Sequence, residues 1–300
     1  MAIFAINSDR YLSVVRDGIA LWAAVVLPSL FPFFFLTALL SGLGVTATLT
    51  AKLSPLTRRA FRTSGVTAYA FFLSAVSGYP IGAKVIATLS ADKRLSADEA
   101  TRAACFCTTV SPMFAIGSIG TCLLENKRVG MIIYLSHIVA TLLTGVFFRF
   151  YGKDEIDARP FSPPKADELL SDAMASSVAS VLAVGGFIAF FYTLVAILHD
   201  FRVLEPIVNL LTLPLGDRTL AKGFLYGLLE CTTGCKVLAS ANSAYVPSLI
   251  GFLISFGGVS VFCQNLVFLK KAKVKTAVYL ASKAVQAILS SLFIFLCTAL

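Results

Sequence analysis

Six long apolar stretches constrain the fold of this chain more than any other feature of its sequence. Five contain no charged side chain and the last contains only Lys283; they cover residues 18–40, 103–124, 129–148, 173–198, 246–269 and 276–300. A helix needs about 20 apolar residues to cross a bilayer. The composition agrees, because 57% of the residues are hydrophobic and 14% are charged, against about 45–50% and about 25% in soluble domains. The chain is therefore predicted to be an all-α polytopic membrane protein.

Two shorter apolar segments are interrupted by residues that do not continue a regular helix. Residues 66–91 are broken at Ser77-Gly78-Tyr79-Pro80-Ile81-Gly82, and residues 223–240 are broken at Glu230-Cys231-Thr232-Thr233-Gly234. Glycine and proline favour such interruptions. Each broken segment follows a polar segment, 41–65 or 199–215, that we expect to lie on the membrane surface.

The order of segments indicates an internal duplication. Each half consists of a long span, a surface segment, a broken segment and two further spans, and Gly82-Ala83-Lys84-Val85 recurs as Gly234-Cys235-Lys236-Val237. We predict a first repeat at 1–152, a hydrophilic linker at 153–172 and a second repeat at 173–300. Helices broken at matching places in two repeats indicate the binding site of a secondary transporter.

The distribution of basic residues favours one of two topologies. If both broken segments dip into the membrane and return, about six transmembrane helices and two re-entrant helical hairpins form two inverted repeats. The loops then carry 15 Lys and Arg residues on one side and 7 on the other. If both segments cross, the chain has eight full spans, and the two sides carry 13 and 9. Because Lys and Arg accumulate in cytoplasmic loops, we predict the inverted arrangement and keep eight spans as the alternative.

The breaks supply the candidate substrate-binding residues. Backbone groups freed inside a bilayer need partners in protein, water or ligand, and helix N-termini attract anions; a simple kink between packed helices is the alternative. Polar residues of the following spans also face this region in the predicted arrangement. The candidates are Ser77, Gly78, Tyr79, Pro80, Gly82, Lys84, Ser111, Glu230, Thr232, Thr233, Gly234, Lys236 and Asn265.

Three charged residues within the apolar segments carry the sharpest hypotheses. Lys84 and Lys236 occupy equivalent positions in the two repeats, where pseudo-symmetry places them across one cavity and suits them to a small dianion such as a dicarboxylate. Alternatively, each lysine snorkels to the interface, or Glu230 neutralises Lys236. Glu230 is also a candidate site for a coupling proton or cation. Lys283 has no equivalent in the other half and is expected to snorkel.

Other functional classes lack support in the sequence. No catalytic constellation, metal-ligand cluster or nucleotide-binding glycine pattern is present, so we predict neither an enzyme nor a cofactor. The basic residues are scattered over loops, which argues against nucleic-acid binding. The predicted partners are a small anionic substrate, the lipid bilayer and a coupling cation or proton; association with further copies of the chain stays open.

Two motifs resemble a known family. The stretches SGYPIGAK at 77–84 and CFCTTVSPMFAIGSIG at 105–120 are similar to the YlbJ-type sporulation integral membrane proteins, the SpoVV group. These belong to the nucleoside-recognition or gate-domain families, whose architecture is similar to the core of concentrative nucleoside transporters. The resemblance implies inverted repeats, re-entrant hairpins and a role in moving dipicolinate across the outer forespore membrane. The nucleoside-transporter hairpin motifs are not matched. A transporter of nucleosides or other small metabolites and a non-transporting assembly protein of sporulation remain the alternatives.

Overall fold

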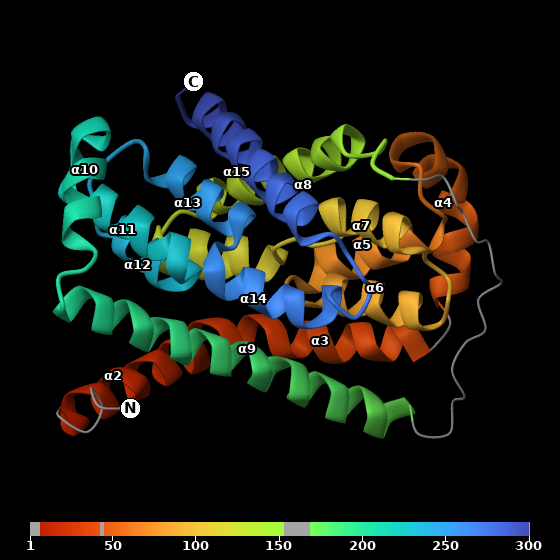
Figure 1. Cartoon of the computed structure of the whole chain (residues 1–300), viewed down its shortest axis with the longest axis horizontal. Coiled ribbons are helices and arrows are strands. Elements are labelled where there is room, and N and C mark those ends of the chain that lie inside the picture. Colours follow the sequence, from red (N-terminus) through yellow and green to blue (C-terminus); the bar gives the residue numbers. More distant parts are fainter. Residues whose placement is uncertain (1–6, 43–44, 153–168, 300) are drawn as a thin grey trace.

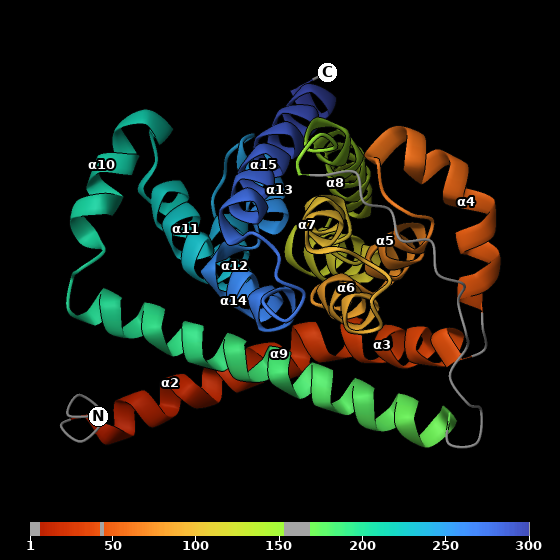
Figure 2. The same cartoon turned by 45° about the vertical axis from the view of Figure 1, so that its right-hand side comes forward.

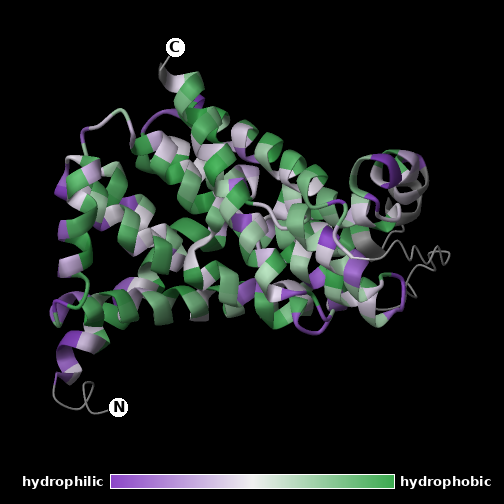
Figure 3. Ribbon diagram, turned by 45° about the horizontal axis from the view of Figure 1, so that its top comes forward, coloured by the Kyte–Doolittle hydropathy of each residue, from purple (hydrophilic) through white to green (hydrophobic). Residues whose placement is uncertain are grey.

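A computed structural model describes residues 7–42, 45–152 and 169–299. Within these ranges the regular structure is helical and contains no strand, which confirms the all-α prediction. Hydrophobic residues run along most of the helices, and hydrophilic ones gather mainly at helix ends and connections (Figure 3). The chain is an integral membrane protein.

The first half starts with a long, nearly continuous helix and ends with a single span. Its elements are α2 (Ser8–Leu21), η1 (Trp22–Val26), α3 (Leu27–Gly42), α4 (Val45–Phe61), α5 (Val66–Ser77), α6 (Ile81–Ala91), α7 (Ala97–Phe106), η2 (Met113–Leu123) and α8 (Lys127–Phe147). Here η1 and η2 are π-helical. Helices α5 and α6 form a hairpin around the first predicted break.

The second half follows the same order. Its elements are α9 (Leu169–Asp200), α10 (Glu205–Leu215), α11 (Arg218–Leu229), α12 (Cys231–Ala239), α13 (Val246–Phe256), α14 (Gly258–Leu269) and α15 (Thr276–Ala299). Helices α11 and α12 form the second hairpin. In both views α2, α3 and α9 lie together along one side of the bundle, and the other helices stack above them (Figures 1 and 2).

Five helices are long and apolar enough to cross a membrane. They are Ser8–Leu40, Lys127–Phe147, Leu169–Asp200, Val246–Leu269 and Thr276–Thr298, and three shorter apolar helices are Val66–Ser77, Ile81–Ala91 and Met113–Leu123. The prediction of about six spans therefore exceeds this number by one. The inverted orientation of the repeats, the re-entrance of the hairpins and the repeat boundaries stay predictions.

Two stretches predicted as uninterrupted spans are divided in the structure. Residues 103–124 are split between α7 and η2 by an irregular segment at 107–112, and residues 246–269 are split between α13 and α14 at Gly257. Pro112 disfavours a helical conformation at Ser111, and Gly257 has a φ of 87°, a conformation that ends helices at glycine. Each half thus contains two breaks.

The linker predicted at 153–172 lies only partly within the described residues. Residues 153–168 lie outside the described residues, and α9 already begins at Leu169. The last four residues of the predicted linker are therefore helical.

The halves interlock through helices that are distant in sequence. Helix α14 contacts α6, while α15 contacts both α7 and α8. The last helix of the second half is consequently part of the core of the first half. This arrangement carries side chains of α15 close to both breaks of the first half.

Close packing of the second hairpin generates a stability prediction. A Cβ atom at Gly234 would lie 2.2 Å from Cα of Gly227, so α12 approaches α11 backbone to backbone. We expect Gly234→Ala to lower the free energy of unfolding by about 1–3 kcal/mol, since the backbone has to move apart. Thermal unfolding in detergent micelles measures this effect.

Gly186→Ala is the matched control, because Gly186 lies in α9 at a place where an added Cβ would meet no neighbouring atom within 4 Å. Replacing an unconstrained helical glycine by alanine is neutral or stabilising. Equal losses of thermal stability in both variants would contradict the close approach at Gly234.

Candidate functional site

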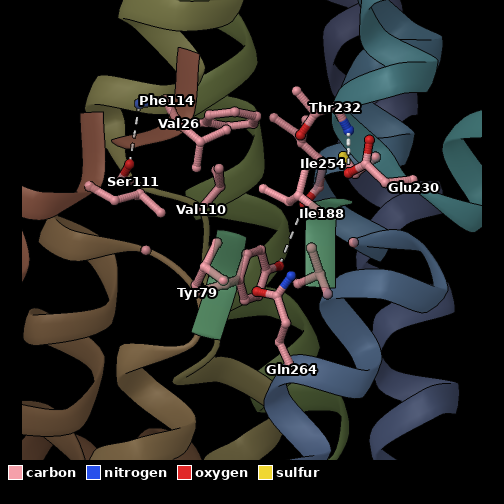
Figure 4. A pocket seen from close by; sticks show the side chains of 16 residues that line it. Val26, Tyr79, Val110, Ser111, Phe114, Ile188, Glu230, Thr232, Ile254 and Gln264 are labelled. Atoms are coloured by element: carbon pink, nitrogen blue, oxygen red, sulfur yellow. Dashed lines mark hydrogen bonds between the residues drawn. The ribbon is translucent and has the colours of Figure 1, made fainter. Parts of the chain in front are cut away.

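A cavity lies where the four helix breaks meet. Each break contributes to its wall: Gly78 and Tyr79, Val110 and Ser111, Glu230 with Cys231 and Thr232, and Gly257. The remaining wall comes from η1, α3, η2, α9, α13 and α14, through Val26, Leu30, Phe114, Val184, Ile188, Ile254, Val261 and Gln264. Tyr79 and Ser111 approach from the first half, and Glu230 and Thr232 from the second (Figure 4).

The cavity is small in this conformation. Its volume is about 60 Å³, which is room for a few water molecules. Its wall is mostly apolar, with polar groups at Tyr79, Ser111, Glu230, Thr232 and Gln264. A mostly apolar pocket with a few convergent polar groups is typical of small-molecule sites.

The first break is held by side chains of its own half. The N–H of Gly78 donates to the carbonyl of Ser74 at 2.7 Å, and Gly78 adopts a φ of 84°, which glycine tolerates without steric cost. Ser77 Oγ lies 3.2 Å from the carbonyl of Phe33 and 3.2 Å from Thr37 Oγ1, both on α3. Pro80 then caps α6. The turn is therefore anchored to α3.

Gly82 allows α6 to approach the second break of the same half. A Cβ at this position would lie 1.6 Å from the carbonyl oxygen of Cys107. Tyr79 reaches in the other direction: its hydroxyl donates to the carbonyls of Ile254 and Ser255 at 3.5 and 3.4 Å. The first hairpin thereby contacts the end of α13 in the second half.

The segment 107–112 is stabilised by buried side chains. The N–H of Thr109 donates to Ser74 Oγ at 2.9 Å, and the N–H of Val110 donates to His137 Nε2 at 3.1 Å. Because His137 accepts at Nε2, its proton is on Nδ1, which donates to Ser255 Oγ at 2.8 Å. Ser111 Oγ accepts from the N–H of Phe114 at 3.2 Å. The irregular backbone thus finds partners inside the protein.

Glu230 caps the N-terminus of α12 from within the cavity wall. Its Oε1 accepts from the N–H of Thr232 at 3.0 Å, and its Oε2 accepts from the N–H and the hydroxyl of Thr233, both at 2.6 Å. Glu230 is 1% exposed. The carboxylate therefore satisfies N–H groups that the helix itself leaves unpaired. Within the described ranges, no ion pair joins Glu230 to Lys236.

The structure brings five of the thirteen predicted site residues to the cavity. These are Gly78, Tyr79, Ser111, Glu230 and Thr232. Four others shape the breaks or their hairpins without lining it, namely Ser77, Pro80, Gly82 and Gly234. Thr233 binds Glu230, and Asn265 is buried on α14 beside the lining residue Gln264.

The two lysines do not face each other across the cavity. Lys84 Nζ lies 2.5 Å from Ser176 Oγ and 3.1 Å from Ser180 Oγ on α9, and Lys236 is exposed. Neither is among the lining residues. The two matching positions therefore have different surroundings: Lys84 on α6 binds serines of α9, whereas Lys236 on α12 is exposed.

Lys283, expected to snorkel, is instead 1% exposed. Its Nζ donates to the carbonyl of Thr108 at 2.5 Å and to Gln286 Oε1 at 2.7 Å. It also lies 5.4 Å from the ring centroid of Tyr79 and 5.6 Å from that of Tyr279. A lysine within the last apolar stretch could have indicated a buried functional charge. Its partners from the first half, Thr108 and Tyr79, could not be predicted from the sequence.

Sequence reasoning also missed the second break of each half. Ser111-Pro112 and Gly257-Gly258 interrupt two apolar stretches that we expected to form uninterrupted spans. Gln264, which is not among the thirteen predicted site residues, lines the cavity. Among the described residues, no three His, Cys, Asp or Glu side chains gather to hold a metal ion.

Two comparisons with known proteins bear on the predicted resemblance. The Gate family model, described as nucleoside recognition, matches residues 23–125, which include both breaks of the first half. The chain is also 28% identical to the sporulation integral membrane protein YlbJ of Bacillus subtilis (strain 168), over 94% of this chain and 76% of that protein. The predicted resemblance is confirmed. No solved structure matches the chain.

The cap at Glu230 generates a stability prediction. Glu230→Ala leaves the N–H groups of Thr232 and Thr233 without their acceptor, so we expect a loss of about 1–2 kcal/mol in the free energy of unfolding. Glu230→Gln retains one acceptor oxygen and should lose less. Thermal unfolding in lipid nanodiscs compares these variants.

Asp217→Ala provides the control, since Asp217 caps α11 by the same type of bond, 2.8 Å from the N–H of Leu220, but is exposed. Solvent can replace that cap, so its loss should be smaller. An unchanged thermal midpoint for Glu230→Ala would show that the cap does not stabilise α12.

Proposed function

We propose that this protein is a secondary transporter of a small anionic solute, which binds in the cavity between the four breaks. The observation that carries the proposal is the composition of the cavity wall, in which each half of the chain contributes two interrupted helices. Irregular backbone at membrane depth is tolerated where it is buried or lines a cavity. Transporter binding sites are built from discontinuous helices in this way.

The ends of the hairpin helices support an anionic solute. Helix α6 begins directly after Tyr79 and Pro80, and no side chain caps its N-terminus. Helix α12 begins at the corresponding place and is capped by a carboxylate. Since a helix N-terminus favours negative charge, a carboxylate of the solute would play at α6 the part that Glu230 plays at α12.

Dipicolinate is the solute that we propose. The relative YlbJ is named a sporulation integral membrane protein, and the family resemblance implies movement of dipicolinate across the outer forespore membrane. The cavity is smaller than an aromatic dicarboxylate needs, so binding requires the hairpins to move apart. Such a widening is expected of alternating access, in which one repeat moves against the other. The solute crosses without chemical change.

Glu230 is our candidate for the coupling site. It is a buried carboxylate in the cavity wall, and ionisable residues at such places commonly carry protons or bind cations in transporters. A proton taken up by Glu230 would weaken its cap on α12, because a neutral carboxyl accepts hydrogen bonds less strongly.

Two other functions make different predictions. The description of the matched family as nucleoside recognition favours a nucleoside as the alternative solute. An assembly protein of sporulation would bind partner proteins and need no flux through the cavity.

Uptake of labelled dipicolinate into proteoliposomes, with and without a proton gradient, tests the proposal. We expect uptake by the wild type that depends on the gradient. Ser111→Ala and Gln264→Leu each remove one polar group from the cavity wall and should reduce uptake about fivefold, which corresponds to one hydrogen bond.

Ser177→Ala removes a buried hydroxyl that donates to the carbonyl of Ala173 outside the cavity and should leave uptake unchanged. Uptake of labelled uridine in place of dipicolinate would support the nucleoside alternative. Absence of any flux, together with normal folding, would contradict a transport function.

A further inference from the structure

The ammonium group of Lys283 is buried in the protein without a counter-ion. Among the residues that the structure describes, no Asp or Glu forms an ion pair with it. Its two hydrogen-bond acceptors, the carbonyl of Thr108 and Gln286 Oε1, are both neutral. Two aromatic rings, of Tyr79 and Tyr279, lie within 6 Å of the nitrogen and stabilise a cation further.

This arrangement differs from that of a lysine that reaches the membrane surface. Lys283 lies about 10 Å along α15 from its first residue, at about 1.5 Å per residue, and its side chain is 1% exposed. An unpaired charge at such a position is costly and marks functional sites in membrane proteins. The two neutral acceptors and the two aromatic rings lower the free-energy cost of burying the ammonium, but none of them carries a negative charge.

The ammonium lies directly behind the wall of the cavity. The ring of Tyr79 lines the cavity, and Lys283 Nζ is 5.4 Å from the centre of that ring. Thr108, whose carbonyl binds the ammonium, is followed two residues later by Val110, which also lines the cavity. Lys283 is therefore attached to both breaks of the first half.

The other charged groups near the cavity cannot supply positive charge. Glu230, the ionisable carboxyl in its wall, is acidic. Lys84 is bound to α9 through Ser176 and Ser180, and Lys236 is exposed. His137 accepts a hydrogen bond at Nε2, so its ring is neutral. Lys283 thus stands out as the cation whose contacts include a wall residue.

We propose that Lys283 is the specificity-determining residue for an anionic solute: its ammonium attracts a carboxylate in the cavity and pairs with it when the ring of Tyr79 moves aside. The inference rests on the proposed function and names the group that recognises its substrate class. In a medium of low polarity, charges a few ångströms apart interact strongly. One solute carboxylate provides the counter-ion that the described residues do not.

The hydrogen bonds of Tyr79 are compatible with such a movement. Its hydroxyl contacts the carbonyls of Ile254 and Ser255 at 3.5 and 3.4 Å, distances longer than those of strong hydrogen bonds. The residue also sits next to Gly78, at the turn of the first hairpin. A rotation of the ring therefore breaks no short hydrogen bond.

Binding of a charged and a neutral ligand by the same variants tests the proposal. The ligands are dipicolinate and its uncharged analogue pyridine-2,6-dicarboxamide, measured with the full-length protein in nanodiscs. We expect Lys283→Met to weaken dipicolinate binding about tenfold or more and to leave the diamide unaffected. Lys283→Arg retains the charge and should keep part of the preference. The double variant Lys84→Gln, Lys236→Gln is the matched control and should behave like the wild type.

A general loss of structure would weaken both ligands equally, which separates a structural role from charge recognition. An unchanged ratio of the two affinities in Lys283→Met would overturn the proposal, whereas weakening in the double variant alone would return the substrate role to Lys84 and Lys236.

A second measurement is independent of the identity of the solute. Cys231 lines the cavity, so it can report on local charge once the six other cysteines, Cys105, Cys107, Cys122, Cys235, Cys263 and Cys297, are replaced. We compare its modification by an anionic and a cationic methanethiosulfonate reagent. Lys283→Met should shift the ratio of the two rates about tenfold towards the cationic reagent.

An unchanged ratio, or no reaction with the anionic reagent in either protein, would overturn the proposal. If dipicolinate does not bind but the ratio shifts, the choice of solute in the proposed function is wrong while Lys283 still selects anions.

Discussion

Backbone N–H and C=O groups released at four helix breaks determine how the rest of this structure is arranged. In an apolar environment each unpaired group is costly, so side chains from neighbouring helices come to meet them. Ser74 and His137 bind the segment 107–112, Glu230 binds the start of α12, and Lys283 binds the carbonyl of Thr108. Polar side chains are buried inside the bundle because they pair with these backbone groups. The cavity lies where the four breaks come together.

The sequence predicted the helical class, the duplicated order of segments and the two hairpin breaks, because each has a local signal. Runs of about 20 apolar residues define spans, and Gly78 with Pro80 cannot continue a helix. The breaks at 107–112 and Gly257 were missed, since an apolar stretch with one Pro or Gly also suits a continuous membrane helix. What distinguishes them is their partners, such as His137 for Val110, which come from distant parts of the chain.

The charges show the limit of reasoning from symmetry. Equivalent positions in two repeats suggested that Lys84 and Lys236 share one cavity, yet one is bound to α9 and the other is exposed. Lys283, whose Nζ lies 5.4 Å from the ring centroid of the wall residue Tyr79, has no counterpart in the first half. Positions that match in the order of segments need not share one site, because each half contacts different neighbours.

Largely different residues support the helix breaks and line the cavity, and this separation has an evolutionary consequence. The backbone at the breaks is held by Ser77, His137 and the carboxylate of Glu230, whereas the side chains of Val26, Ile188 and Gln264 line the cavity wall. Substitutions among the latter leave the supports of the breaks in place. In a scaffold of this kind a handful of point mutations can change the chemistry of the cavity, without remodelling the surface that faces lipid.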